Sequence, residues 1–162
     1  MNNIQVNFED DSILKEIKAK VKSGIIKDDV IDTSLIDLTE KFALDIKEKG
    51  ISNSSIRNIY DSFKNLQQRL TQEYIKKLSE NLLDTKGAEN EAFRKIFPMI
   101  KLMKSKTFYV LERKAQDEKN INMRKSYLAL KEFISVFITN IKSKKEYDAF
   151  VDLFECIIGN LK

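Results

Sequence analysis

Apolar residues recur every three or four positions along most of this chain, which is the spacing of one face of an α-helix. The longest stripe follows the Ser/Asn cluster in "ISNSSIRNIY" and comprises Ile56, Ile59, Tyr60, Phe63, Leu66, Leu70 and Tyr74. No segment alternates convincingly with the two-residue period of a strand. The pattern therefore predicts helices and no strand.

Six helices can be placed in this way. The first three are expected from about Ser12 to Lys22, from Thr33 and Ser34 to Gly50, and from the Ser/Asn cluster to near Leu83. The third is expected to be the longest, and "DTKGAENE" is expected to be a loop after it. The polar stretch containing Asp28, Asp29 and Asp32 is interpreted as a solvated linker rich in capping residues.

The last three helices are expected at about 90–115, 122–141 and from Ser143 to Leu161. Pro98 would either kink the fourth helix or begin a fresh one, since proline suits the first helical turn. Ser143 and Glu146 are spaced as a capping box. Short connections after Gly50 and Lys142 favour antiparallel neighbours. We predict an all-α fold: one compact helical bundle of about five to six helices over residues 1–162, in which 1–33 could be a looser segment.

Length and composition agree with a bundle. The chain has 162 residues, 42% of them hydrophobic, with four glycines and one proline, too few turn residues for a β-sandwich. We expect Phe63, Phe133, Phe150 and Phe154 to share its core. No apolar run approaches the roughly 20 residues that span a bilayer, and no signal peptide is visible, so we expect a cytoplasmic protein without membrane contact.

Missing residue types argue against an enzyme. The chain has no histidine, and Cys156 is its single cysteine, which is expected to pack in the core. The familiar glycine-rich phosphate loops do not occur. The acidic residues are scattered, although paired carboxylates could still hydrolyse a substrate or hold magnesium. We therefore expect no catalytic residues, no cofactor and no metal.

The positive charge is concentrated in the middle of the chain. Residues 1–50 hold 8 basic and 11 acidic residues, 51–125 hold 16 and 9, and 126–162 hold 5 of each. This distribution favours a local anion-binding surface.

The segment "MIKLMKSKTFYVLERK" carries most of that surface. On a wheel of 100° per residue, its core-facing arc contains Ile100, Met103, Thr107, Val110 and Leu111. Five candidate anion-binding residues lie at the borders or on the outside of this arc: Lys101, Lys104, Lys106, Tyr109 and Arg113. Lys114 is the remaining candidate cation of the segment. Arg57 and Lys64 are two turns apart on the preceding helix and complete the set.

Structural explanations exist for the same residues. Lysines at the border of an apolar arc can simply cover the core edge with their stems. Arg57 can pair with Asp61 at i,i+4, and Tyr109 can be a packing residue. From composition and spacing alone, the partner is either a nucleic acid or an acidic protein surface.

Three segments resemble the small-subunit family of type III-A CRISPR effector (Csm) complexes. The capped start "ISNSSIRNIY" places Arg57 at a family arginine. The segment "KSKTFYVLER" places Lys104, Tyr109 and Arg113 on marked positions of a family helix, and "FVDLFECIIGNLK" resembles its closing helix. The resemblance spans about residues 35 to 162. Three departures are Glu112 where a small residue is usual, Gly159 where alanine is commoner, and Ser55 where glutamine often completes the cap.

The resemblance implies a non-catalytic, RNA-binding subunit in antiviral defence. Family members stack along the complex beside backbone subunits and a large signature subunit, and their basic grooves follow the guide RNA and its paired target RNA. The basic residues named above would then contact phosphates. The resemblance leaves open whether Glu112 screens the charge of Arg113. The alternative is a helical adaptor whose basic face docks an acidic protein partner.

Overall fold

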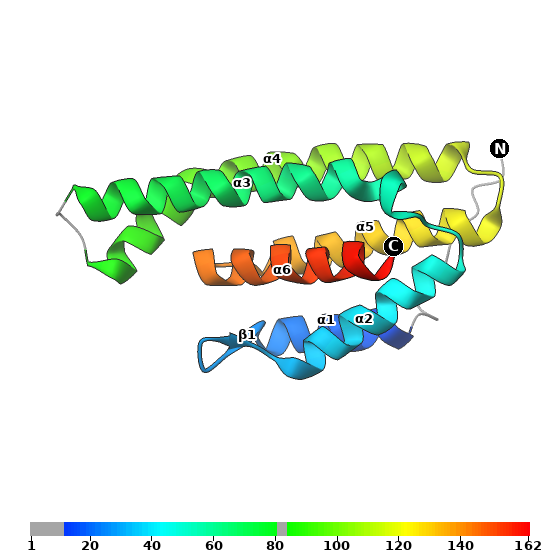
Figure 1. Ribbon diagram of the computed structural model, residues 1–162, viewed down its shortest axis with the longest axis horizontal. Coiled ribbons are helices and arrows are strands. Elements are labelled where there is room, and N and C mark those ends of the chain that lie inside the picture. The colour runs from blue at the N-terminus through cyan, green and yellow to red at the C-terminus, as the bar shows by residue number, and fades with distance from the viewer. Residues whose placement is uncertain (1–11, 81–83) are drawn as a thin grey trace.

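The chain folds into three layers of paired helices, as a computed structural model shows (Figure 1). The structure describes residues 12–80 and 84–162. Its elements are α1 (Ser12–Ser23), β1 (Ile26–Lys27), β2 (Val30–Ile31), α2 (Thr33–Glu48), α3 (Asn53–Ser79), α4 (Thr85–Asp117), α5 (Ile121–Asn140) and α6 (Lys144–Asn160).

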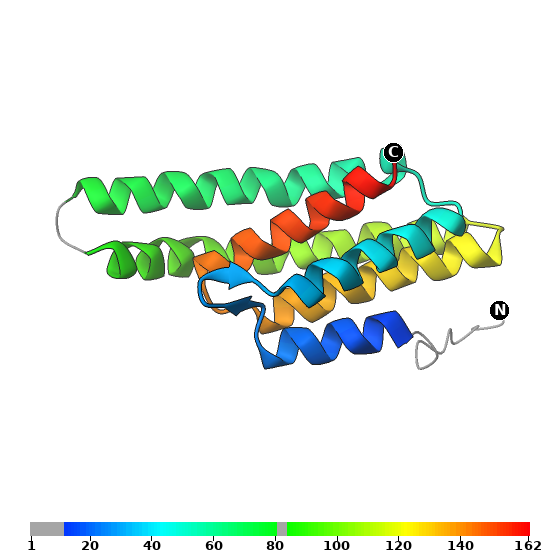
Figure 2. The same ribbon diagram turned by 60° about the horizontal axis from the view of Figure 1, so that its bottom comes forward.

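Each layer holds two helices side by side. The antiparallel pair α3 and α4 forms the first layer, and α2 and α1 form the third (Figures 1 and 2). In the middle layer, α6 packs on α3 and α2 while α5 packs on α4 and α1. The rings of Phe137 and Phe150, with centroids 5.5 Å apart, bring α5 and α6 together. In the view of Figure 1, α3, α6 and α2 lie in front of α4, α5 and α1. The all-α prediction is confirmed.

One hydrophobic cluster runs through all three layers. Phe63, Phe133, Phe150 and Phe154 are fully buried in it, as the helical stripes predicted. The rings of Phe63 and Phe150 meet edge to face with centroids 5.3 Å apart. Phe42 stacks on Phe133 at 5.1 Å and so joins α2 to α5. Aromatic pairs of this kind add to the burial of apolar area.

The expectation of no strand was wrong in one place. β1 and β2 form a small antiparallel hairpin in which Ile26 pairs with Ile31 and Lys27 with Val30. Its two turn residues, Asp28 and Asp29, both have positive φ, 51° and 65°, as a type I′ turn requires. Four residues of strand are too few for an alternating pattern to be recognised.

The predicted loop "DTKGAENE" is mostly helix. The side chain of Asp84 accepts a hydrogen bond from the backbone N–H of Gly87 and caps α4, which then begins at Thr85. α4, at 33 residues, is therefore longer than α3 at 27. α3 ends at Ser79, and Leu83, where its pattern was expected to fade, lies outside the described residues.

Pro98 lies inside α4 and does not begin a separate helix. Figure 1 shows α4 changing direction after its first turns, as an internal proline is expected to cause. The Ser143 cap is confirmed: its Oγ accepts from the backbone N–H of Glu146 at 3.2 Å. The return bond to Glu146 comes from the backbone N–H of Lys142 rather than of Ser143.

Candidate nucleic-acid interface

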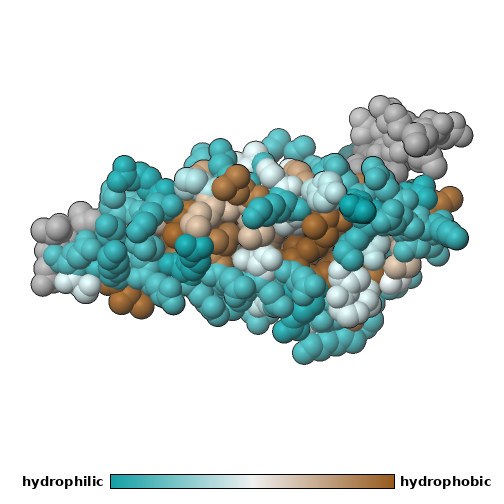
Figure 3. Space-filling view, turned by 90° about the horizontal axis from the view of Figure 1, so that it is seen from above, coloured by the Kyte–Doolittle hydropathy of each residue, from teal (hydrophilic) through white to brown (hydrophobic). Residues whose placement is uncertain are grey.

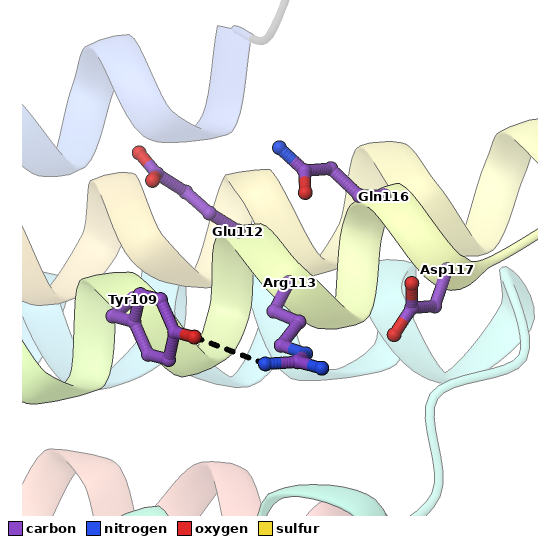
Figure 4. Close-up of a pocket in the computed structure, with 5 residues that line it drawn as sticks. All are labelled: Tyr109, Glu112, Arg113, Gln116 and Asp117. Atoms are coloured by element: carbon purple, nitrogen blue, oxygen red, sulfur yellow. Dashed lines mark hydrogen bonds between the residues drawn. The ribbon is translucent and has the colours of Figure 1, made fainter.

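Arg113 and Tyr109 form the best-defined polar contact on the outer side of α4. One guanidinium nitrogen of Arg113 donates a hydrogen bond to the Tyr109 hydroxyl at 3.0 Å (Figure 4). A hollow of about 290 Å³ opens beside them, lined also by Glu112, Gln116 and Asp117. Asp117 lies one turn further along, and no carboxylate of the described chain forms an ion pair with Arg113. A neutral partner leaves the Arg113 charge available for an anion.

Glu112 forms its ion pair with a residue of a different helix. Its carboxylate pairs with the Nζ of Lys131, which α5 contributes from 19 residues away. Figure 4 shows Glu112 and Arg113 pointing to different sides of α4. Glu112 therefore does not neutralise Arg113, which answers the question left open by the sequence.

Three lysines of α4 lie over aromatic rings instead of beside acids. The Nζ of Lys104 lies 5.6 Å from the ring centre of Phe108, and that of Lys101 lies 5.4 Å from Phe97. Lys131 of α5 approaches the same Phe108 ring at 5.2 Å, so Lys104 lies on the α5 side of α4. Lys114 likewise lies over Tyr127 of α5 at 5.9 Å. Ring contacts orient the ammonium groups without cancelling their charge.

Lys106 is exposed on the opposite border of the α4 arc. Its position is two turns from Arg113 on the same line of the helix, about 10 Å along the axis. Within residues 12–80 and 84–162, Lys101, Lys104, Lys106, Arg113 and Lys114 form no ion pair with a carboxylate.

The α3 residues belong to a different surface. Arg57 pairs with Asp61 through Nε at 3.5 Å and lies 5.8 Å from the ring centre of Tyr60. Lys64 is half-buried and close to Asp152 of α6. Burial and the nearby Asp148 raise the pKa of the Asp152 carboxyl, and Lys64 opposes that shift. The acids near Arg57 and Lys64 make α3 a weaker anion site than α4.

The outer face of α3 and α4 is partly apolar. Figure 3 shows hydrophobic side chains gathered along its middle, between hydrophilic margins. Leu102 and Tyr109 are 64% and 62% exposed, and Val110 is 38% exposed. Val110 was expected to face the core, and its exposure shows that this expectation was wrong.

Cys156 was expected in the core but is only half-buried. Burial, helped by the nearby Glu40, raises the pKa of its thiol, which keeps it protonated at neutral pH. In the part of the chain that the structure describes, no cluster of acidic or cysteine side chains could hold a metal ion. Over the same residues, no helix is both long and apolar enough to cross a membrane.

The predicted residues therefore fall into three groups. Lys104 and Lys114 face α5, and Lys101 lies over a ring of its own helix. Lys106, Tyr109 and Arg113 lie on the outer side of α4. Arg57 and Lys64 lie toward α6. Lys131 is the relevant residue that sequence reasoning missed, because the equal numbers of acids and bases in 126–162 concealed it.

A family model described as Csm2 of type III-A matches residues 31–160. The chain belongs to the Csm2 family. As a Csm2-family member it is a small subunit of the type III-A Csm complex, in which it assembles with other subunits. The match covers α2 to α6 and leaves α1 and β1 outside it. No curated protein and no solved structure matches the chain significantly.

Proposed function

We propose that this chain is a non-catalytic subunit that holds the guide RNA and target RNA of the complex by their backbones, through the basic residues of α4. The observation that carries the proposal is that five cations on one helix have no acidic partner among the described residues. Glu112, which could have neutralised Arg113, is bound to Lys131. Charges left unpaired on an ordered helix suit repeated contacts with phosphates.

Phosphate contacts position a strand without reading its bases, so specificity would come from base pairing. The Lys106 and Arg113 pair would contact one strand, with Tyr109 holding the guanidinium in place. Arg57 and Lys64 would contribute less, because acids lie near both. Copies of the subunit stacked along the complex would gain affinity through multivalency, so a single copy is expected to bind weakly.

Charge reversal tests the proposal. The double variant Lys106→Glu/Arg113→Glu should weaken binding of two single-stranded RNAs of unrelated sequence to a similar extent. It should also lower the magnitude of the log–log salt slope by about 0.7 for each phosphate that the protein no longer neutralises. The matched control is Lys41→Glu/Lys47→Glu on α2, which changes the formal charge equally. Unchanged affinity and slope in the α4 variant, with normal helicity by circular dichroism, would contradict the proposal.

The exposed side chains of Leu102, Tyr109 and Val110 favour a second candidate, an adaptor that docks an acidic protein on the same face. The two functions separate in a reconstituted complex. If the chain is an adaptor, Lys106→Glu/Arg113→Glu should lose assembly with the other subunits, while the isolated variant chain keeps the RNA affinity of wild type. The RNA-binding function predicts the reverse.

A further inference from the structure

Positive charge is segregated to one side of the molecule. α4, α5 and α1, the rear helices of Figure 1, together hold 15 basic and 6 acidic residues. α3, α6 and α2, in front of them, hold 9 and 10. Lys104 and Lys114 lie on the α5 side of α4, so positive charge continues from α4 across α5 toward α1, which lies outside the family match.

α1 places three lysines in one stripe. Leu14, Ile17 and Val21 are buried and hold α1 against α2 and α5. On a helical wheel, which advances 100° per residue, a sector of about 60° beside that buried face contains Lys15, Lys18 and Lys22. The stripe extends about 10 Å along the helix.

The stripe lies on the side of α1 that faces away from α2. The other side of α1 contributes Glu16 and Lys20 to a hollow of about 590 Å³ shared with α2. α1 packs against α2 and α5, so the side of α1 that faces away from α2 is the side that borders α5. Its lysines thus belong to the side formed by α4, α5 and α1.

Within the described chain, these lysines have no acidic partner. All three are exposed, and among the residues placed by the structure none of them forms an ion pair. Lysines elsewhere in the fold are commonly paired, as Lys49 is with Asp45 and Lys144 is with Asp148. The placement of α1 is set by its buried residues, so the unpaired charges occupy a defined position.

α5 bridges the two basic helices, since it packs against both α4 and α1. Lys131 lies at its border with α4, and Lys125 of the same helix is exposed. Packed helices are about 8–10 Å apart, so α4 and α1 are separated by roughly 20 Å. A single strand bound at α4 would not cover this width, whereas a paired RNA presents two phosphate backbones.

We propose that Lys15, Lys18 and Lys22 contact the second backbone of a paired RNA whose first backbone lies on α4. The inference rests on the proposed function and extends it to a helix outside the family match. It makes the α4–α5–α1 side, rather than α4 alone, the RNA-binding surface.

The test uses the full chain with Lys15, Lys18 and Lys22 replaced by Gln. Its control replaces Lys41, Lys47 and Lys76 by Gln, which removes the same charge from α2 and α3. Binding is measured to one RNA, alone and annealed to its complement, over a range of salt. The α1 variant should bind the paired RNA about tenfold more weakly at low salt, as expected for three exposed contacts of about 0.5 kcal/mol each. The single strand should be affected less, and Lys→Arg at the three positions should restore binding.

The outcomes separate this inference from the proposed function. If wild-type protein binds RNA and Lys106→Glu/Arg113→Glu impairs it, but the α1 variant binds normally, the inference is wrong and the proposed function stands. Equal losses in the α1 variant and its control would also overturn the inference, because net charge alone would explain them. Equal losses for single and paired RNA would overturn the assignment to a second backbone. No binding by wild type would remove both proposals.

Discussion

Asp32 stabilises the start of α2 and the end of the hairpin through its carboxylate. Oδ1 accepts hydrogen bonds from the Ser34 backbone N–H at 3.1 Å and from the Ser34 hydroxyl at 2.8 Å. Oδ2 forms an ion pair with the Nζ of Lys27 at 3.1 Å. Hydrogen bonds from Ser34 and Lys27 lower the pKa of this carboxyl to about 2. The linker containing Asp28, Asp29 and Asp32 thus divides into two turn residues and one cap.

Asp32→Asn should destabilise the protein in a pH-dependent manner. Because the folded pKa is below the ordinary value of 3.8, the ionised carboxylate contributes stability above pH 4, and this contribution disappears as pH falls toward 2. The difference between wild type and Asp32→Asn, measured by urea denaturation, should be largest near neutral pH and shrink on acidification. Asp37→Asn, an exposed acid on the same helix, is the control. A difference that stays constant from pH 7 to pH 2.5 would contradict the assignment.

At the scale of elements, two glycines show how a position just after a helix differs from one within its last turn. Gly50 follows α2 with φ +106°, and its N–H donates to the carbonyl of Lys47 at 3.0 Å, as at many helix C-termini. A Cβ placed there would lie 2.9 Å from the Cγ of Met123 in α5. Gly159 lies in α6 with ordinary helical backbone, and a Cβ there would meet nothing within 4 Å.

The two alanine variants should therefore have opposite effects. Gly50→Ala should lower the free energy of unfolding by about 1–3 kcal/mol, because alanine is strained at positive φ. Gly159→Ala should raise it by about 0.5 kcal/mol, because alanine has the higher helix propensity. Each value can be measured by chemical denaturation. Equal effects of the same sign would show that Gly50 does not hold the conformation described.

At the scale of the whole molecule, α1 and the other helices share one hydrophobic core. Ile17 of α1 is fully buried in the same cluster as Phe42 and Phe133. Lys145 of α6 also pairs with Asp29 in the hairpin at 3.1 Å. We therefore propose that α1 unfolds with the rest of a single domain. The alternative expectation, a looser segment in residues 1–33, remains open to the same test.

Ile17→Ala measures this coupling. If α1 belongs to one cooperative unit, the variant should be destabilised by about 2–5 kcal/mol, and far- and near-ultraviolet circular dichroism should report the same shifted transition. Ala19, exposed on the same helix, provides the control variant Ala19→Ser. An unchanged main transition in Ile17→Ala would show that α1 is a separate, weakly attached segment.

The amino-acid sequence by itself determined the helices and their faces. Apolar spacing placed all six helices and the four phenylalanines of the core, because helix periodicity relates residues only three or four positions apart. The cap at Ser143 and the exposed positions of Lys106 and Arg113 on α4 followed from the same short-range geometry. A helix start that depends on one capping side chain, as the start of α4 depends on Asp84, was missed because the surrounding polar residues suit a loop equally well.

Only the tertiary structure decided which charges are neutralised and which helices share a side. Glu112 lies next to Arg113 in the chain, yet its partner is Lys131 on α5. The lysines of α1 belong to an N-terminal region of net negative charge, so the charge distribution along the sequence does not reveal them. The packing of α1 beside α5 places them on the same side of the molecule as α4. Such pairings depend on which helices become neighbours, and that choice is made by burial of apolar faces over the whole chain rather than by local spacing.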